Sequence, residues 1–307
     1  MKPERLRRTG LLAVLCWTLA GCAAPLPALR AQTAPLAGQA APAARSVAEQ
    51  VDVTGPRGRL DKAARARLLE RIGREGGDSP LRRQLAAMSA FGDIDLHTGN
   101  TARLLVDGPA TFGAMFAAIE RAQQSVLLES YIIEDAKIAQ DLARLLARKR
   151  AEGVAVAVLH DAVGSISTGD DYFEGLRAAG VAVCAFNPLS PLRKRRYQDI
   201  THRDHRKILV VDRDTAYTGG INISAVYSSA SIGRRSPEHD HLGWRDTQIE
   251  LRGPAARALD DLVRDTWRSQ HCEQPLPPPA DAAVRGPPGP HTVRIVAGSP
   301  EDEPNRI

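Results

Sequence analysis

Between residues 102 and 268 short apolar runs alternate with longer amphipathic segments, and this alternation most constrains the fold. Short runs of β-branched residues indicate strands, whereas apolar positions three and four residues apart indicate helices. Strands that alternate with helices favour an α/β fold in which helices cover a largely buried sheet. We expect strands at residues 102–106, 125–131, 154–159, 181–186, 208–211 and 247–251, and helices at residues 109–123, 136–151, 172–179 and 254–268.

A cluster of polar residues begins just before the expected strand 208–211. It follows the patterns H-x-K-x-x-x-x-D and G-G-x-N with His205, Lys207, Asp212, Gly219, Gly220 and Asn222. Residues two apart on a strand point to the same face, so the His205 imidazole and the Lys207 ammonium are expected to share one surface. A neutral imidazole can attack phosphorus while a fixed lysine holds the phosphoryl oxygens. Glycine lets the backbone approach a ligand closely, and the Asn222 amide can donate to a third oxygen.

A solvated basic strand end followed by a Gly-Gly hairpin is the alternative interpretation, and a lone H-x-K would deserve it. The six residues together, however, resemble the HKD motif of the phospholipase D superfamily. The resemblance is to the cardiolipin synthase branch in particular and covers about residues 95–270. It is carried by segments 204–212 and 216–223, and further by segments 129–132, 161–165, 244–247 and 253–254.

This resemblance implies a phospholipase D-like α/β sandwich with a mixed, largely buried sheet and a single catalytic half, over residues 95–272. It also implies phosphatidyl transfer or phosphodiester hydrolysis on phospholipids, in which His205 forms a phosphohistidine intermediate. Lys207 and Asn222 would stabilise the charge on the phosphoryl group, Gly219 and Gly220 would line the phosphate site, and no metal or organic cofactor is needed. A nuclease of the same superfamily is the alternative, because such a site recognises a phosphodiester and little else.

The second ring nitrogen of a catalytic histidine needs a partner that fixes its tautomer. Asp212 belongs to the motif, but a five-residue strand spans about 17 Å, which is too far for contact with the histidine. Asp212 would then hold local loops or the strand end, and a simple turn aspartate is an equal alternative. The resemblance gives the partner of His205 as Asp246, which precedes the strand expected at 247–251.

The first 21 residues have the pattern of an export signal, in which basic residues precede an apolar run too short for a stable membrane anchor. Residues 19–22 resemble a bacterial lipobox, which implies cleavage before Cys22 and lipid attachment to its sulfur. A plain secretory signal or an uncleaved helix is the alternative. We therefore expect a lipid-anchored lipoprotein of the bacterial cell envelope, on the periplasmic side. Residues 22–58 are expected to form an Ala/Pro-rich tether, and residues 59–94 a helical lead-in with helices at about 59–72 and 79–90.

Charge and cysteine content constrain the function less. The net charge is +5, but residues 1–21 carry +3 of it, so the processed chain is close to neutral and its charge does not indicate a nucleic-acid partner. Seven basic residues nevertheless crowd residues 193–207, where they could focus anionic headgroups or simply form a solvated loop. Cys184 lies in an expected strand and Cys272 in a polar segment, and their sequence contexts predict no disulfide framework.

Histidines outside the motif could bind a metal or line the pocket, and we considered two groups of them. His239 and His241 lie two apart, but no cysteine or further histidine has ligand-like spacing, so we expect no metal site there. His160 and Asp161 end the strand expected at 154–159 and could line the pocket, although a buried strand-end histidine with a structural role is the favoured interpretation.

Enzymes of the resembled family use two HKD motifs that face each other, whereas only His205 of the eight histidines has a lysine two residues on. Residues 273–307 contain a proline-rich linker followed by segment 293–300, which echoes segment 102–109 and fits the start of a truncated second repeat. We expect either a fragment of a two-motif enzyme or a second motif supplied by another chain, as in a homodimer. The expected partners are a phospholipid substrate and a membrane surface. A catalytically silent lipoprotein that binds anionic lipid is the alternative from another functional class.

Overall fold

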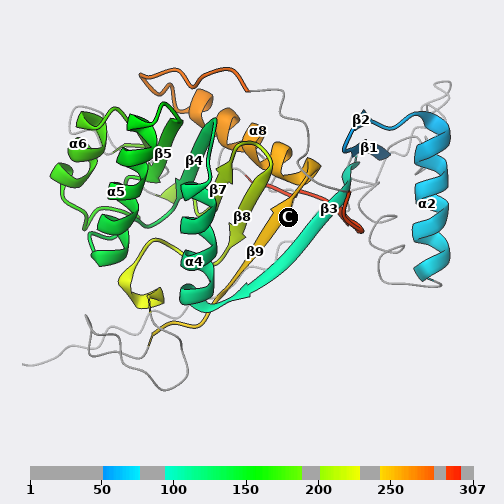
Figure 1. Cartoon of the computed structure of the whole chain (residues 1–307), viewed down its shortest axis with the longest axis horizontal. Coiled ribbons are helices and arrows are strands. Elements are labelled where there is room, and N and C mark those ends of the chain that lie inside the picture. Colours follow the sequence, from blue (N-terminus) through cyan, green and yellow to red (C-terminus); the bar gives the residue numbers. More distant parts are fainter. Residues whose placement is uncertain (1–50, 77–93, 189–200, 229–242, 280–287, 299–307) are drawn as a thin grey trace, which may run out of the picture. The chain divides into compact units, whose positions relative to one another are not determined.

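The computed structural model describes residues 51–76, 94–188, 201–228, 243–279 and 288–298. These residues form a mixed sheet with helices on both faces, as the alternating sequence predicted (Figure 1). The strands lie in the order β2-β1-β3-β9-β8-β7-β4-β5-β6, and β10 pairs with β3. The strands are β1 (Val51–Gly55), β2 (Gly58–Arg59), β3 (Ile94–Val106), β4 (Ser125–Ser130), β5 (Ala155–Asp161), β6 (Ala182–Phe186), β7 (Lys207–Val211), β8 (Thr215–Gly219), β9 (Thr247–Arg252) and β10 (His291–Val293). The helices are α2 (Lys62–Gly76), α4 (Asp107–Glu120), α5 (Lys137–Ala151), α6 (Asp170–Ala178) and α8 (Pro254–Ser269), with a short 3-10 turn at Ala225–Tyr227.

The sheet has a parallel part and an antiparallel part. β4, β5 and β6 run parallel and are joined through α5 and α6, since parallel neighbours need a crossover connection. β7 pairs antiparallel with β4, and β8, β9 and β3 continue the antiparallel part. As a result, the carboxyl ends of β4 and β5 and the amino end of β7 meet at one edge of the sheet. β8 is a strand that the sequence did not predict.

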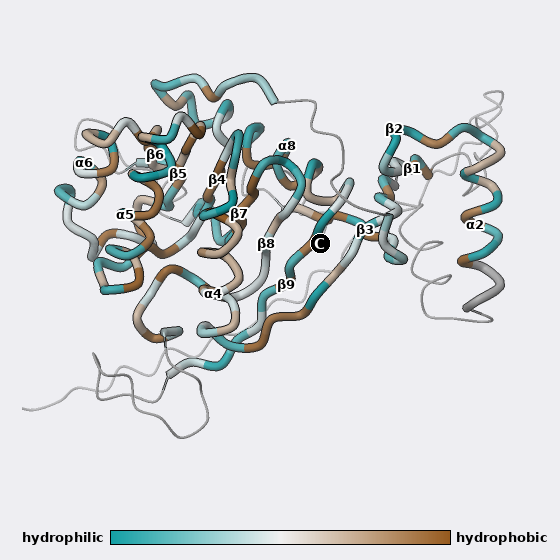
Figure 2. The backbone as a smooth tube through the Cα atoms, in the orientation of Figure 1, coloured by the Kyte–Doolittle hydropathy of each residue, from teal (hydrophilic) through white to brown (hydrophobic). Residues whose placement is uncertain are grey.

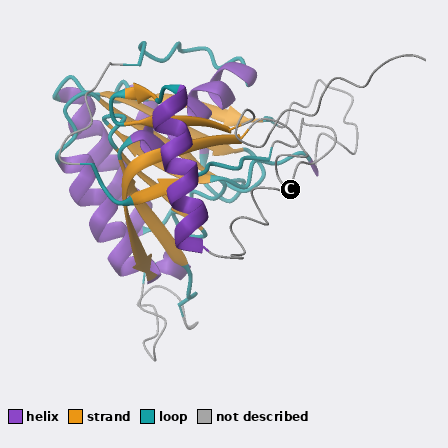
Figure 3. Cartoon of the chain, turned by 90° about the vertical axis from the view of Figure 1, so that its right-hand side faces the viewer, coloured by secondary structure: helices purple, strands orange, loops and turns teal. Residues whose placement is uncertain are grey.

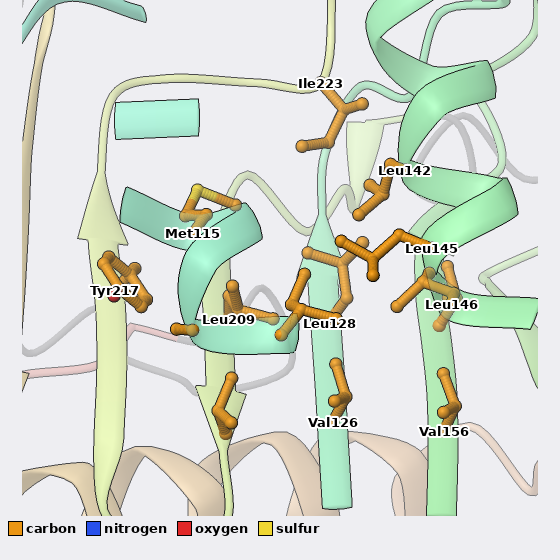
Figure 4. Packing of buried hydrophobic residues seen from close by; sticks show 14 of the residues in the cluster. Met115, Val126, Leu128, Leu142, Leu145, Leu146, Val156, Leu209, Tyr217 and Ile223 are labelled. Atoms are coloured by element: carbon orange, nitrogen blue, oxygen red, sulfur yellow. The ribbon is translucent and has the colours of Figure 1, made fainter. Parts of the chain in front are cut away.

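The larger core lies between the sheet and helices α4, α5 and α6. Alternate strand residues face these helices, because side chains on a strand alternate between faces. Leu128 of β4 and Leu209 of β7 lie side by side between Met115 of α4 and Leu142 and Leu146 of α5, and all five side chains are buried (Figure 4). The intervening strand positions point to the other face. The central strand β7 is accordingly hydrophobic along most of its length (Figure 2).

Helix α8 packs against the other face of the sheet. Figure 3 shows helices on both sides of the strands. Val210 and Ala216 on the strands pack with Val263 and Trp267 of the helix. The helix begins with Pro254 in its first turn, where the missing backbone N–H costs nothing. Its Ala255 N–H donates to the side chain of Asn100 at 2.8 Å, so a residue of β3 caps the helix. None of the helices in the described part of the chain is long and apolar enough to cross a membrane.

The amino-terminal boundary of the folded part differs from the expectation. Val51–Gly55, placed in the expected tether, form β1 and pair in parallel with the beginning of β3. Val51 and Val53 are buried together with Leu68 and Leu96. The tether prediction is therefore wrong over residues 51–58, because a single pair of alternating valines is too short a pattern to indicate a strand. The signal, Cys22 and the helix expected at 79–90 lie outside the described residues.

Cys184 of β6 and Cys272, just beyond α8, form a disulfide between residues 88 apart in sequence, with a Cα–Cα distance of 5.6 Å. The expectation of no disulfide framework is therefore wrong. The spacing could not reveal it, because the strand order is what brings the β6 edge beneath the end of α8. His291–Val293 pair with β3, and their membership of a second repeat stays a prediction.

Candidate active site

The histidine and lysine of the HKD motif lie at the edge where β4 and β5 end and β7 begins. Lys207, the first residue of β7, lies opposite Ser130, the last residue of β4. β8 ends at the same edge, where Gly219 pairs with Gln248 near the beginning of β9. Antiparallel pairing thus gathers the separate pieces of the motif around one point at the edge of the sheet.

His205 and Lys207 are in contact, as their two-residue spacing predicts. Lys207 Nζ lies 3.1 Å from Nδ1 of His205 and donates to the His205 carbonyl oxygen at 2.8 Å. The lysine side chain is buried, whereas the histidine is exposed. The ammonium therefore lies next to the imidazole, and Nε2 is the ring nitrogen that Lys207 does not contact.

This contact determines what the imidazole can do. A charged ammonium donates to Nδ1, so a neutral His205 ring in this arrangement carries its proton on Nε2. Attack on phosphorus through Nε2 needs that nitrogen unprotonated and the proton on Nδ1. Lys207 therefore has to exchange its contact with Nδ1 for contacts with phosphoryl oxygens when His205 acts as a nucleophile.

The protonation states of the pair suit phosphoryl chemistry at neutral pH. Partial burial of the imidazole lowers the pKa of His205 and the charge of Lys207 lowers it further, against the opposite effects of Asp204 and Asp161. Burial lowers the pKa of Lys207 to about 8, against Asp204 and Asp246. At pH 7 the imidazole is thus largely neutral and the lysine largely charged, as a nucleophile and a phosphate-binding cation should be.

Tyr131 follows β4 directly and contacts both side chains. The centroids of the Tyr131 and His205 rings are 4.2 Å apart at an interplanar angle of 41°, and Lys207 Nζ lies 5.0 Å from the Tyr131 centroid. In the sequence this tyrosine stood out only within segment 129–132 of the family resemblance. No spacing rule links it to His205, because the two meet through the pairing of β4 with β7.

The G-G-x-N residues lie beside the pair, but their contacts are with protein groups. Asn222 is buried, its Oδ1 accepts from the N–H of Ile132 at 3.1 Å, and its side chain hydrogen-bonds to Tyr227. A Cβ on Gly219 would lie 2.4 Å from the carbonyl oxygen of Thr247. The glycine is therefore required by the close approach of β9. The phosphate-binding role of Gly219, Gly220 and Asn222 stays a prediction.

Asp246 lies at the same edge but does not form the expected pair with the histidine. Its carboxylate accepts from the N–H of Thr247 at 2.7 Å, and its carbonyl oxygen accepts from the N–H of Asp107 at 2.8 Å. Among the hydrogen bonds of the described residues, none joins Asp246 to His205. Its negative charge acts instead on Lys207, whose pKa it raises. A catalytic role for Asp246 stays a prediction.

Asp212 lies at the far end of β7 from His205, and its place among the catalytic residues stays a prediction. Its carboxylate accepts from the backbone N–H groups of Gln123, Gln124 and Ser125 at 2.7–3.1 Å, where the chain enters β4. Asp212 itself has φ of +52°, a conformation that aspartate tolerates better than most residues. Asp212 therefore stabilises the turn and the end of the strand, as expected for a motif residue too far from His205 for contact.

A buried ionic cluster anchors the residues on either side of His205. Arg206 Nε lies 3.0 Å from Glu129 Oε1 and 2.8 Å from Asp204 Oδ1. Burial raises the pKa of Glu129 well above its usual range, and a hydrogen bond to Asp204 raises it further. The buried carboxylate of Asp161 accepts from the N–H of Asp204 at 3.0 Å. The position of the imidazole is thus fixed through both of its neighbours in the chain.

His160 has the structural role that the sequence predicted for it, that of a buried histidine at the end of a strand. It is buried, stacks on Phe173 at a centroid distance of 3.8 Å, and has its pKa lowered by burial to about 4. Residues 193–196, His239 and His241 lie outside the described residues.

A cavity of about 600 Å³ opens beside His205 on the α8 side of the sheet. Its lining includes Arg203, Arg206, Ile208, Leu259, Leu262, Arg294, Ile295 and Val296.

Comparison with known proteins shows what this region is similar to. Residues 115–230 match the model of the family described as cardiolipin synthase, PLD-like domain. Cardiolipin synthase A of Pseudomonas entomophila (strain L48) is 40% identical over 184 residues, which are 60% of this chain and 36% of the relative. Cardiolipin synthase A of Pseudomonas aeruginosa (strain LESB58) is 37% identical over 206 residues, 66% of this chain and 39% of the relative. The chain thus spans between a third and two fifths of the length of these curated relatives.

Among solved structures, the phospholipase D family member Nuc from Salmonella typhimurium is 16% identical with a TM-score of 0.40, covering 55% of this chain and 95% of that one. NucT from Helicobacter pylori is 15% identical with a TM-score of 0.42, covering 55% and 97%. The matched residues 115–230 include His205, Lys207 and Asn222. Residues 115–230 are therefore similar to the phospholipase D-like domain of cardiolipin synthases.

Proposed function

We propose that the protein transfers phosphatidyl groups, or hydrolyses phosphodiesters, on phospholipids through a phosphohistidine intermediate at His205. The observation that carries this proposal is the buried Lys207 ammonium held 3.1 Å from Nδ1 of His205. It joins a nitrogen nucleophile to a fixed cation, the two groups that phosphoryl substitution needs. The identity of 40% with a cardiolipin synthase supports the same reaction class.

The reaction would proceed in two displacements at phosphorus. In the first, a ring nitrogen of His205 attacks phosphorus, the bond from phosphorus to one ester oxygen breaks, and the leaving alkoxide takes a proton from a general acid. In the second, the hydroxyl of an alcohol, or water, attacks the same phosphorus and loses its proton to that group, and the phosphorus–nitrogen bond breaks. Lys207 and Asn222 would donate hydrogen bonds to the non-bridging oxygens as charge accumulates on them.

The general acid is proposed to come from a second HKD motif. In this sequence only His205 has a lysine two residues on, and protonation of the leaving group is typically worth 10²–10⁴-fold in rate. A second copy of the chain, or a further segment, would supply the missing histidine, and a dimer would place two His205 side chains across a two-fold axis. Light scattering coupled to an activity assay on the same fractions tests this. Full turnover in a strictly monomeric peak would contradict it.

The cavity beside His205 favours a lipid over a nucleic acid. Three arginines, including Arg203 and Arg294, line it with one carboxylate, that of Asp204, beside apolar side chains such as Leu259. This combination suits an anionic headgroup next to hydrocarbon. The test is incubation with labelled phosphatidylglycerol and, separately, with single-stranded DNA. Conversion of the lipid supports the proposal, whereas cleavage of the DNA alone would assign a nuclease. Vesicle binding without turnover would assign a silent lipid-binding lipoprotein.

We also propose that the protein resides in the bacterial cell envelope, on the periplasmic side, anchored through Cys22. The disulfide between Cys184 and Cys272 supports an oxidising compartment, because disulfides are rare in the reducing cytosol. The lipobox-like residues 19–22 support acylation. Mass spectrometry of the processed amino terminus tests the anchor, with Cys22→Ser as the variant that blocks acylation. An unacylated amino terminus at another residue would contradict the proposal.

A further inference from the structure

We propose that Tyr131 is a positioning residue for this reaction, an inference that rests on the proposed function: its ring holds the His205 imidazole and the Lys207 ammonium in their relative orientation. One aromatic ring contacts both groups, with a centroid distance of 4.2 Å to the imidazole and 5.0 Å to Lys207 Nζ. A cation within about 6 Å of an aromatic centroid is attracted by the negative face of the ring. The contact with Lys207 is within this range.

The ring contributes more here than it would on a surface. Lys207 is buried, so its ammonium has lost much of the water that would otherwise stabilise its charge. The face of Tyr131 partly replaces that water, together with the charges of Asp204 and Asp246. His205 also becomes more positive when its nitrogen bonds to phosphorus. The same ring lies against it, so Tyr131 favours the charged forms of both groups.

Tyr131 is itself held firmly by the turn that follows β5. The hydroxyl of Ser165 donates to the Tyr131 carbonyl oxygen at 3.3 Å and accepts from the N–H of Ile133 at 3.0 Å. Gly164 lies against the tyrosine so closely that a Cβ there would be 2.8 Å from two ring carbons and 2.2 Å from the carbonyl oxygen. A glycine at this position therefore permits the packing that fixes the ring.

A single carboxylate joins this support to the histidine. Asp161 accepts from the N–H groups of Val163 and Gly164, at 2.8 Å and 2.9 Å, and so shapes the turn that holds Tyr131. Its other oxygen accepts from the N–H of Asp204 at 3.0 Å, immediately before His205. The Asp161 carboxylate thus hydrogen-bonds both to the turn that supports the Tyr131 ring and to the residue before His205, which stabilises the separation of the two rings.

The test compares the wild-type chain with Tyr131→Leu, which removes the ring, and Tyr131→Phe, which restores it without the hydroxyl. The pKa of Lys207 is measured by NMR on ¹³C-lysine-labelled protein, and kcat and KM are measured with phosphatidylglycerol. In Tyr131→Leu we expect the Lys207 pKa to fall by about 1 and kcat to fall about 2- to 30-fold, with KM nearly unchanged. Tyr131→Phe should recover the pKa and most of kcat.

Replacement of Tyr131 by pentafluorophenylalanine supplies a second comparison if the leucine variant fails to fold. This side chain keeps the shape of phenylalanine but reverses the charge distribution of the ring, so the Lys207 pKa should fall relative to Tyr131→Phe. An unchanged Lys207 pKa in the folded ring-deficient or fluorinated protein would overturn the inference. Absence of turnover by the wild type in an assembly that contains two HKD motifs would instead reject the proposed function, and the pKa comparison would still decide the role of Tyr131.

Discussion

The carboxylate of Asp246 packs directly on Gly220: a Cβ added to this glycine would lie 2.2 Å from both carboxylate oxygens. Gly220→Ala should therefore displace Asp246 and lower turnover about 10- to 100-fold, because misplacement of a site group by about 1 Å can cost 10²-fold. Gly113→Ala is the matched control, since a Cβ there meets nothing within 4 Å. Turnover and thermal melting of both variants check this, and wild-type turnover by Gly220→Ala would contradict it.

The charge of Asp246 should be visible in the pH dependence of the reaction. Asp246 raises the pKa of Lys207, so Asp246→Asn removes a stabilising charge and lowers that pKa below about 8. The alkaline limb of kcat, where the ammonium is lost, should move to lower pH. We expect turnover to fall by less than the roughly 10⁴-fold seen when a serine protease loses its orienting aspartate. A pH profile with an unmoved alkaline limb would argue against any action of Asp246 on Lys207.

His205→Ala should abolish turnover together with any acid-labile phosphoenzyme, because no other described residue offers a nitrogen nucleophile beside Lys207. His202→Ala is the control: this histidine is exposed and three residues earlier, and the variant should retain substantial activity. Both are to be assayed in an assembly that contains two HKD motifs. A phosphoenzyme that survives His205→Ala would show that the nucleophile lies elsewhere.

Glu129→Gln should stabilise the protein at neutral pH. Burial and the neighbouring Asp204 raise the pKa of Glu129 in the folded state above its ordinary value of about 4.3 and outweigh the opposing charge of Arg206, so the protonated form favours folding. The stability that goes with protonated Glu129 is fully present below about pH 4.3 and is lost as the pH rises through the raised pKa of Glu129 in the folded state. Urea unfolding at pH 4 and pH 8 should show an advantage of the glutamine variant only at pH 8. An equal advantage at both pH values would exclude ionisation of Glu129 as the cause.

The disulfide should contribute substantially to stability, since it joins residues 88 apart in sequence. A cross-link restricts the unfolded chain, and we expect Cys272→Ser to lower the free energy of unfolding by about 2–4 kcal/mol. Cys184→Ser should match it, and a reducing agent should bring the wild type down to the level of either variant. Sensitivity of the serine variants to the same reducing agent would show that it acts on another group.

The residues that sequence reasoning placed correctly are those whose neighbours are local. The two-residue spacing puts Lys207 next to His205, and the alternation of apolar segments gives the α/β class. Contacts that depend on strand order were missed, such as Tyr131 on His205 and Cys184 on Cys272, because pattern and spacing do not say which strands pair. Asp246 was inferred only from family resemblance, and its nearest contacts follow from the pairing of β8 with β9.

Strand β3 changes neighbours along its length. Its first residues pair with β1 and β10, and residues 101–106 pair with β9. The thirteen residues from Ile94 to Val106 extend over about 43 Å at the usual rise of a strand, and the N–H of Asp107 then bonds to Asp246. The length of β3 thus sets the distance between its pairing with β1 and the sheet edge where Asp107 bonds to Asp246. A single residue inserted into β3 would turn every following side chain of the strand to the opposite face of the sheet. Insertions are therefore compatible with the fold only outside the paired residues of β3.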